Sequence, residues 1–339
     1  MTVVEAPART PKPKVDKSTD FRQQGRLAAY LLTPTMAVLA VVIGYPILAA
    51  IYQSMFTQGQ GVDADGFVIQ GDTFVGLGNY AAIFKGDTGA RFWNAFYNTT
   101  LFTVVCVIIE VILGVAMALI MNKAFKGKGL IRASILVPWA IPTVVSAKLW
   151  AWIFDANGIA NSILGQQILW STDGPQAKLA VIIADTWKTA PFIGLLVLAG
   201  LQVIPADIYE AAKIDGANAW RSFWSMTLPL VKPALLVAVL FRILDNLRMF
   251  DLPYVLIGKG KPSVETLSIL AQQESVNTRY GPAAAYAVLL FLYLVVVAYA
   301  FIKLLGADVI GDARQGSRAK VKGQKRSKVG RSTAKGDTP

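Results

Sequence analysis

The sequence of 339 residues contains no histidine and a single cysteine, Cys106. Without histidine the chain cannot contain a histidine-based zinc site or a Ser-His-Asp triad, and one cysteine cannot form an intrachain disulfide. Charged residues are also scarce, at 16% of the chain against about a quarter in an average soluble domain. We therefore expect neither a metal site nor a catalytic residue in this chain.

Apolar residues make up 54% of the chain and gather in long segments. A hydrocarbon core of about 30 Å requires about 20 apolar residues in a helix, and six segments are that long. We expect an all-α membrane protein with six transmembrane helices within residues 27–305. The predicted spans are Leu27–Phe56, Tyr97–Met121, Leu130–Phe154, Lys178–Ile204, Ala234–Ile257 and Pro282–Leu305.

Lysine and arginine in the connecting segments indicate the orientation of these spans. With the N-terminus inside, the cytoplasmic segments carry 21 Lys and Arg residues and the outer segments carry 5. Positive residues concentrate on the cytoplasmic side of membranes, so we expect both termini and the loop 205–233 in the cytoplasm.

The two tails are expected to be disordered because they are polar and basic. Residues 1–26 are rich in Pro and Lys and have no apolar run, so they do not form a signal peptide. Residues 306–339 are rich in Gly, Ser, Lys and Arg, which predicts a solvated segment that either anchors the orientation or contacts anionic lipid. The net charge of +12 therefore indicates membrane lipid and not nucleic acid as its partner.

The stretch EAAKIDGANAWRSFWSMTLP, at 210–229, interrupts the apolar pattern between the fourth and fifth spans. Pro205 suits the first turn of a helix, and Gly216 suits the left-handed residue that ends one. A second amphipathic turn then carries Trp220 and Phe223 on one side. The pattern predicts two short helices, and on physical grounds they fit either a lipid interface or the groove of another protein.

This stretch resembles the EAA loop of binding-protein-dependent ABC importer permeases. The family pattern is Glu-Ala-Ala, three residues, Gly, nine residues, Ile, any residue and Leu-Pro, and Met226 stands here in place of Ile. The matching positions are Glu210, Ala211, Ala212, Gly216, Leu228 and Pro229. By resemblance they couple the permease to a separate ATPase subunit, with Glu210 contacting a basic group on that subunit.

The resemblance extends over roughly residues 27–305 and is to six-span sugar permeases of the maltose type. FVGLGNYAAIF at 74–84, FWNAFYNTTLFTVV at 92–105 and the Pro-rich LVPWAIPTVVSAKLWAWIFDANGIANSIL at 136–164 are similar to segments of that family. WKTAPFIGLLVLAGLQVIPADIYEAAKIDGA at 187–217 is similar to its consensus. MFDLPYVLIGKGKP at 249–262 departs from it where Gly258-Lys259-Gly260-Lys261-Pro262 replaces a Gly-Gly-Pro turn.

The resemblance implies a bacterial inner-membrane importer subunit that is not itself an enzyme. It implies a second homologous permease, an ABC ATPase dimer and an extracellular sugar-binding lipoprotein as partners. ATP and Mg²⁺ then belong to the ATPase, and this sequence indeed contains no G-x-x-x-x-G-K-[ST] motif. The chain is most similar to disaccharide permeases of the trehalose type, so trehalose is the first expected solute, ahead of maltose, other oligosaccharides and glycerol phosphate.

Charged residues inside the predicted spans are the candidate substrate path. Such groups cost about 2.5–3.5 kcal/mol each at the bilayer centre and usually face the bundle interior. Arg242, Asp245, Arg248 and Asp251 alternate in sign at a spacing of three, which fits a self-neutralising ladder, a polar path wall, or both. Resemblance to the maltose permease places the path at Asp185, Lys188, Thr189, Phe192, Arg242, Asp245, Asn246, Met249 and Asp251.

Two other classes of protein remain as alternatives. A gradient-driven secondary transporter could use Glu110 and the acids of the fifth span as protonation sites. A membrane enzyme could use paired carboxylates. Six spans without an inverted repeat and the EAA pattern argue against the first, and the sequence offers no paired-acid motif on an exposed loop for the second.

Overall fold

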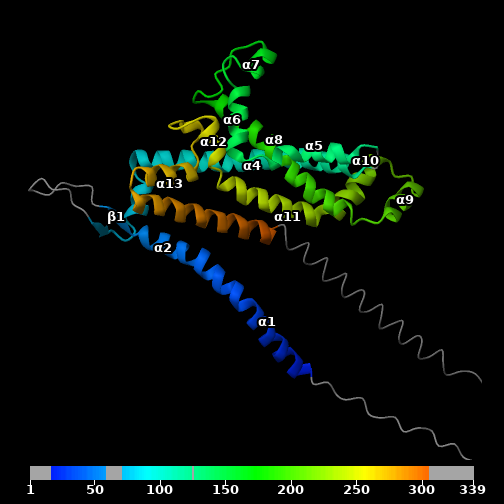
Figure 1. Cartoon of the computed structure of the whole chain (residues 1–339), viewed down its shortest axis with the longest axis horizontal. Coiled ribbons are helices and arrows are strands. Elements are labelled where there is room, and N and C mark those ends of the chain that lie inside the picture. The colour runs from blue at the N-terminus through cyan, green and yellow to red at the C-terminus, as the bar shows by residue number, and fades with distance from the viewer. Residues whose placement is uncertain (1–16, 59–70, 124–125, 305–339) are drawn as a thin grey trace, which may run out of the picture. The chain divides into compact units, whose positions relative to one another are not determined.

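The computed structural model describes residues 17–58, 71–123 and 126–304, and these residues are mostly helical (Figure 1). The chain divides into two compact units, the first ending at Tyr52 and the second beginning at Gln53. The expectation of disordered tails concerns mainly residues 1–16 and 305–339, which lie outside the described residues, so it stays a prediction.

The first unit is a single run of helix. It consists of α1 (Lys17–Leu39), a π-helical turn η1 (Ala40–Gly44) and α2 (Tyr45–Gln53). The π-helical turn ends at Gly44, two residues before Pro46. Proline has no backbone N–H to continue the helical hydrogen-bond pattern. The apolar part, Leu27–Gln53, is long enough to cross a membrane, and α1 itself begins ahead of the predicted span.

The second unit is built on three helices that pack together, α4 (Gly86–Asn122), α8 (Pro175–Leu201) and α11 (Leu228–Leu247). The end of the chain's described part is a further apolar helix, Tyr280–Leu304. Within the described residues, five helices and one bent pair are long and apolar enough to cross a membrane, and each overlaps one of the six predicted spans.

Small residues allow α4 and α8 to approach closely, as is common between helices in membranes. A Cβ added at Gly114 would lie 2.7 Å from Cβ of Ile193 and 3.0 Å from the carbonyl oxygen of Ala190. Opposite it, a Cβ at Gly194 would lie 3.2 Å from the carbonyl oxygen of Gly114. The α4–α8 contact therefore requires glycine at residue 114.

Replacing Gly114 with leucine is expected to destabilise the protein by about 1–3 kcal/mol or more, because overpacking moves backbone and not only a flexible side chain. Thermal unfolding of the detergent-purified chain measures the effect. Gly129→Leu is the control, because a Cβ at Gly129 meets nothing within 4 Å. Equal unfolding temperatures for the two variants would show that the close approach of α4 and α8 is not needed.

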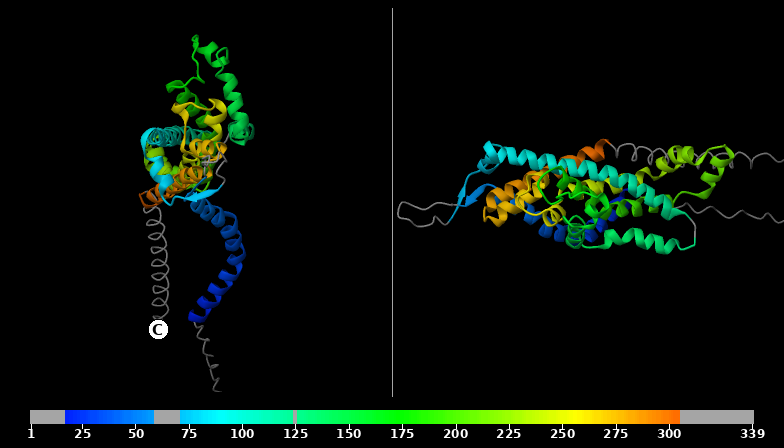
Figure 2. Two further views of the ribbon diagram at one scale, coloured as in Figure 1. Left: turned by 90° about the vertical axis from the view of Figure 1, so that its left-hand side faces the viewer. Right: turned by 90° about the horizontal axis from the view of Figure 1, so that it is seen from above.

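The third predicted span is not straight. It consists of α5 (Lys128–Ala140) and α6 (Thr143–Ile153), which are bent by 96° relative to each other. The bend lies at Pro142, and the preceding Ile141 has the extended conformation that proline favours in the residue before it. From this bend α6 and the following α7 (Ile159–Leu164) rise away from the helices that run beside α4 (Figures 1 and 2).

The fifth predicted span, Ala234–Ile257, is also interrupted. Helix α11 ends at Leu247, and a short helix α12 (Asp251–Leu256) follows and packs against α6. The proposed charge ladder is therefore wrong at its last step, because Asp251 lies beyond the break. Arg242 and Arg248 do both pair with Asp245, at 2.6 and 3.7 Å between nitrogen and carboxylate oxygen.

The segments predicted to lie outside contain structure that apolar patterns did not reveal. Residues 54–85 include an antiparallel strand pair and a short helix, and residues 258–279 include a 3₁₀ turn and a helix that packs on α4. These elements are β1 (Phe56–Gln58), β2 (Asp72–Phe74), α3 (Gly78–Ile83), η3 (Pro262–Val264) and α13 (Leu267–Val276).

Candidate functional site

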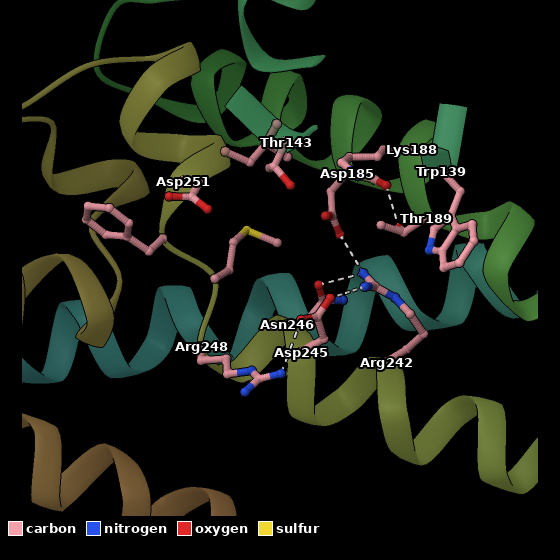
Figure 3. Close-up of a pocket in the computed structure, with 13 residues that line it drawn as sticks. Trp139, Thr143, Asp185, Lys188, Thr189, Arg242, Asp245, Asn246, Arg248 and Asp251 are labelled. Atoms are coloured by element: carbon pink, nitrogen blue, oxygen red, sulfur yellow. Dashed lines mark hydrogen bonds and ion pairs between the residues drawn. The ribbon is translucent and has the colours of Figure 1, made fainter. Parts of the chain in front are cut away.

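A polar cavity of about 170 Å³ lies where the helices of the second unit are interrupted. Trp139 and Thr143 reach it from the two sides of the α5–α6 bend, α8 forms one wall, and the end of α11 with the break before α12 forms another (Figure 3). Non-helical backbone at membrane depth is tolerated where it lines a cavity, which both interruptions do. The lining residues are Trp139, Thr143, Asp185, Lys188, Thr189, Arg242, Asp245, Asn246, Arg248, Met249, Phe250, Asp251 and Leu252.

Arg242 is the centre of an ion-pair network beside this cavity. Its Nε and Nη2 donate to the two carboxylate oxygens of Glu110 at 2.8 and 2.9 Å. Its Nη2 also lies 3.2 Å from Asp185 Oδ2 and 2.8 Å from Asn246 Oδ1, and its Nη1 donates to Asp245 Oδ2 at 2.6 Å. The guanidinium fork is suited to such planar, bidentate pairing.

This network joins three helices, because Glu110 is on α4, Asp185 is on α8 and Arg242 is on α11. The Glu110 side chain is fully buried, and that of Arg242 is 4% exposed. Thr189 of α8 contributes a further contact, because its hydroxyl donates to Glu110 Oε1 at 2.8 Å. Buried charges at this depth are tolerated only when they are paired, so the network fixes how the three helices meet.

Lys188 and Asn246 of the lining each carry a nitrogen without a partner among the described residues. The ammonium of Lys188, on α8, makes no hydrogen bond or ion pair within the described part of the chain. The side-chain nitrogen of Asn246 is buried and has no partner among the described residues, while its oxygen accepts from Arg242. The lining therefore combines unpartnered hydrogen-bond donors with the carboxylates of Asp185 and Asp245.

The structure brings together eight of the nine predicted path residues, since they line one cavity. The ninth, Phe192, is not in the lining. Its ring centroid lies 5.9 Å from that of Trp139 and 6.5 Å from that of Phe241. Phe192 therefore packs against Trp139, which does line the cavity. That these residues contact a substrate stays a prediction.

The sequence analysis did not place five residues of the cavity or its network on the substrate path. A lone carboxylate in an apolar span was the signal for Glu110, whereas the others reach the cavity only because helices break there. These residues are Glu110, Trp139, Thr143, Phe250 and Leu252.

A polar strap, formed by η3 and the residues up to Thr266, is tied by hydrogen bonds to the break after α11 and to α4. The Thr266 hydroxyl donates to the carbonyl oxygen of Met249, a lining residue, at 2.8 Å. Ser263 N–H donates to Asp173 Oδ1 at 2.8 Å, and hydrogen bonds from Ser263 hold the pKa of Asp173 below its ordinary value. Asn98 of α4 donates to the carbonyl oxygens of Pro262 and Glu265 at 2.8 and 3.0 Å.

The segment 205–233 forms the two short helices that its sequence predicted. Helix α9 (Ala206–Ile214) begins after Pro205, and Gly216 has a positive φ of 75° where the chain turns. Helix α10 (Ala219–Ser222) follows, with the Asn218 side chain accepting from Arg221 N–H at 2.8 Å. A π-helical turn, η2 (Phe223–Thr227), then leads into α11.

The six residues of the EAA pattern do not share one environment. Glu210, Ala211, Gly216 and Pro229 are exposed, Leu228 is half-buried and Ala212 is fully buried. Ala212 therefore packs inside this chain, and its small size serves the fold of the loop. Glu210 and Ala211 are left on the free surface, where a partner subunit can contact them.

Residues 110–311 match the family model described as "Binding-protein-dependent transport system inner membrane component". The trehalose/maltose transport system permease protein of Thermococcus litoralis is 38% identical over 288 residues, which cover 83% of this chain and 94% of that protein. The trehalose transport system permease protein of Mycobacterium tuberculosis is 37% identical over 319 residues, 93% of this chain and all of that protein.

Solved structures share the fold at low sequence identity. A bacterial ABC transporter for import of the acidic polysaccharide alginate has a chain that superimposes with a TM-score of 0.70 at 19% identity, covering 85% of this chain and 98% of its own. A chain of the MetNI methionine ABC transporter gives a TM-score of 0.51 at 16% identity, with 66% and 98% coverage. These two structures show the fold alone.

Proposed function

The chain belongs to the family of binding-protein-dependent transport system inner membrane components, and on this premise we propose that it conducts a carbohydrate, first of all trehalose, through an ATP-driven importer. It is a multi-pass inner-membrane permease, and its helices are long and apolar enough for that role. The observation that carries the proposal is the polar cavity, which lies among interrupted helices and is lined by charged groups.

A sugar suits this lining because it presents many hydroxyl groups that both donate and accept hydrogen bonds. Lys188 and Asn246 supply donors, and Asp185 and Asp245 supply acceptors. Trp139 offers an aromatic face for the C–H side of a sugar ring. Trehalose comes first because two of the relatives are named for trehalose transport, and maltose, other oligosaccharides and glycerol phosphate follow.

The cavity of this single chain is smaller than a complete binding site. Small-molecule sites usually measure about 300–1,000 Å³, and this cavity measures about 170 Å³. A second homologous permease would supply the other wall of the pathway. Rocking of the two permeases would then open the cavity to one side of the membrane at a time.

Helix α9 is the proposed contact with an ABC ATPase dimer, through exposed Glu210 and Ala211. Hydrolysis belongs to that partner, which binds ATP and Mg²⁺, and this chain is not an enzyme. An extracellular sugar-binding lipoprotein would deliver the solute to the strap at η3. This arrangement places both termini and the α9–α10 loop in the cytoplasm, as the distribution of Lys and Arg favours.

Uptake of labelled trehalose in a deletion strain tests the role of the cavity. Lys188→Met is expected to lower the uptake rate about tenfold or more, because a hydrogen bond to a charged group contributes about 1.5–3 kcal/mol. Lys148→Met is the matched control, since Lys148 is exposed on α6 and does not line the cavity. Equal uptake by the two variants at equal membrane abundance would remove the cavity from the transport path.

A further inference from the structure

We propose that a groove between α4 and the α9–α10 loop binds one anionic phospholipid of the cytoplasmic leaflet. The groove has a volume of about 740 Å³ and is walled by the last turns of α4 on one side and by α9, α10 and η2 on the other. We call it the interfacial groove. The proposal rests on the cytoplasmic orientation of this loop, and it concerns a site that is separate from the polar cavity.

One face of α4 forms the apolar wall of the interfacial groove. Ile112, Val115, Ala116 and Leu119 recur at helical spacing and all line it. From Ile112 to Lys123 the helix rises about 16 Å, which is close to half of a hydrocarbon core of about 30 Å. The apolar wall is thus about as long as one acyl chain in one leaflet, and Lys123 then lies at the depth of the lipid headgroups.

The other end of the interfacial groove is basic. Lys123, which directly follows α4, and Lys213 of α9 both line it, and neither makes an ion pair within the described part of the chain. No Asp or Glu is among the residues that line it. Tyr209 and Thr227 also line the groove, and their hydroxyl oxygens are 3.2 Å apart. Two free ammonium groups beside hydroxyls suit a lipid phosphate.

Two aromatic side chains also belong to the interfacial groove. Trp220 and Phe223 line the interfacial groove, and their ring centroids are 6.5 Å apart. Trp220 is 71% exposed, which is unfavourable in water but typical of the headgroup level of a membrane. The apolar wall suits an acyl chain, and the two lysines suit a phosphate, so the length of the wall and the charge both favour a phospholipid over a protein segment.

Lipid binding to the purified, delipidated full chain tests this proposal by native mass spectrometry, with phosphatidylglycerol and phosphatidylcholine as the two probes. Each lysine is expected to contribute about fivefold to the affinity for the anionic lipid. The double variant Lys123→Gln/Lys213→Gln should therefore bind phosphatidylglycerol about 25-fold more weakly and phosphatidylcholine unchanged. Ala116→Trp should weaken both lipids, because it fills the apolar wall.

The matched control is Lys126→Gln/Lys128→Gln, which removes the same amount of charge at two exposed lysines that follow α4 and lie outside the groove. An unchanged affinity in this control supports a defined site. An equal loss in both double variants would overturn the proposal in favour of diffuse attraction to the basic loop. Equal binding of the two lipids by the unmodified chain would also overturn it, as would release of the lipid when the ATPase subunits are added.

Discussion

Glu210→Arg is expected to abolish uptake while the protein still inserts into the membrane. Glu210 is exposed on α9 and makes no ion pair within the described residues, so its replacement leaves the fold of the chain intact. The proposed partner surface is basic, and a like-charge contact at an interface costs several kcal/mol. The measurement is uptake of labelled trehalose at matched membrane abundance of the two proteins.

The control for this prediction lies on the same helix. Asp207→Arg makes the same change of charge at another exposed position in the first turn of α9, outside the EAA pattern. We expect it to retain most of the uptake. Normal uptake by Glu210→Arg would contradict the coupling role of α9 and would favour a gradient-driven carrier.

Arg242→Met is expected to destabilise the protein by about 3–5 kcal/mol, the usual effect of removing one partner of a buried ion pair. The substitution leaves the carboxylates of Glu110 and Asp185 buried without their cation. Both are nearly inaccessible, with side chains 0% and 9% exposed, so water cannot replace the guanidinium. Thermal unfolding and the yield of folded, detergent-soluble protein measure this loss.

Arg248→Met is the comparison for Arg242→Met. Its side chain is 66% exposed and its nearest carboxylate oxygen, on Asp245, is 3.7 Å away, so the loss should stay below about 1 kcal/mol. Adding Glu110→Gln to Arg242→Met should recover part of the stability, because one buried charge is then removed. Additive losses in that double variant would show that Glu110 and Arg242 do not act as a pair.

The sequence predicted the helical spans well, because about 20 consecutive apolar residues leave few alternatives to a transmembrane helix. It did not predict where spans break. Pro142 was visible, but proline also occurs within intact helices of this chain, such as Pro191 in α8. Whether a proline bends a helix by 96° depends on neighbouring helices, and apolar patterns do not contain that information.

For the candidate site, too, the sequence predicted residues that lie close together in the chain but not a contact between residues far apart in it. Resemblance placed eight residues in one cavity, because α8 and α11 each carry several of them at nearby positions. Glu110 was missed as a member of the network because it lies 132 positions from Arg242, and only the packing of α4 on α11 brings them together. Ala212 was grouped with Glu210 and Ala211 although it is buried, and Phe192 was grouped with the path residues although it is not in the cavity lining.

Energy coupling is the central claim, and uptake by reconstituted vesicles tests it most directly. The vesicles contain this permease with its co-purified partner subunits, the binding protein and labelled trehalose outside, and no ion gradient. With ATP on the cytoplasmic side we expect trehalose to accumulate, and with a non-hydrolysable ATP analogue we expect none. Accumulation by this chain alone, without ATP and driven by a proton gradient, would contradict the account.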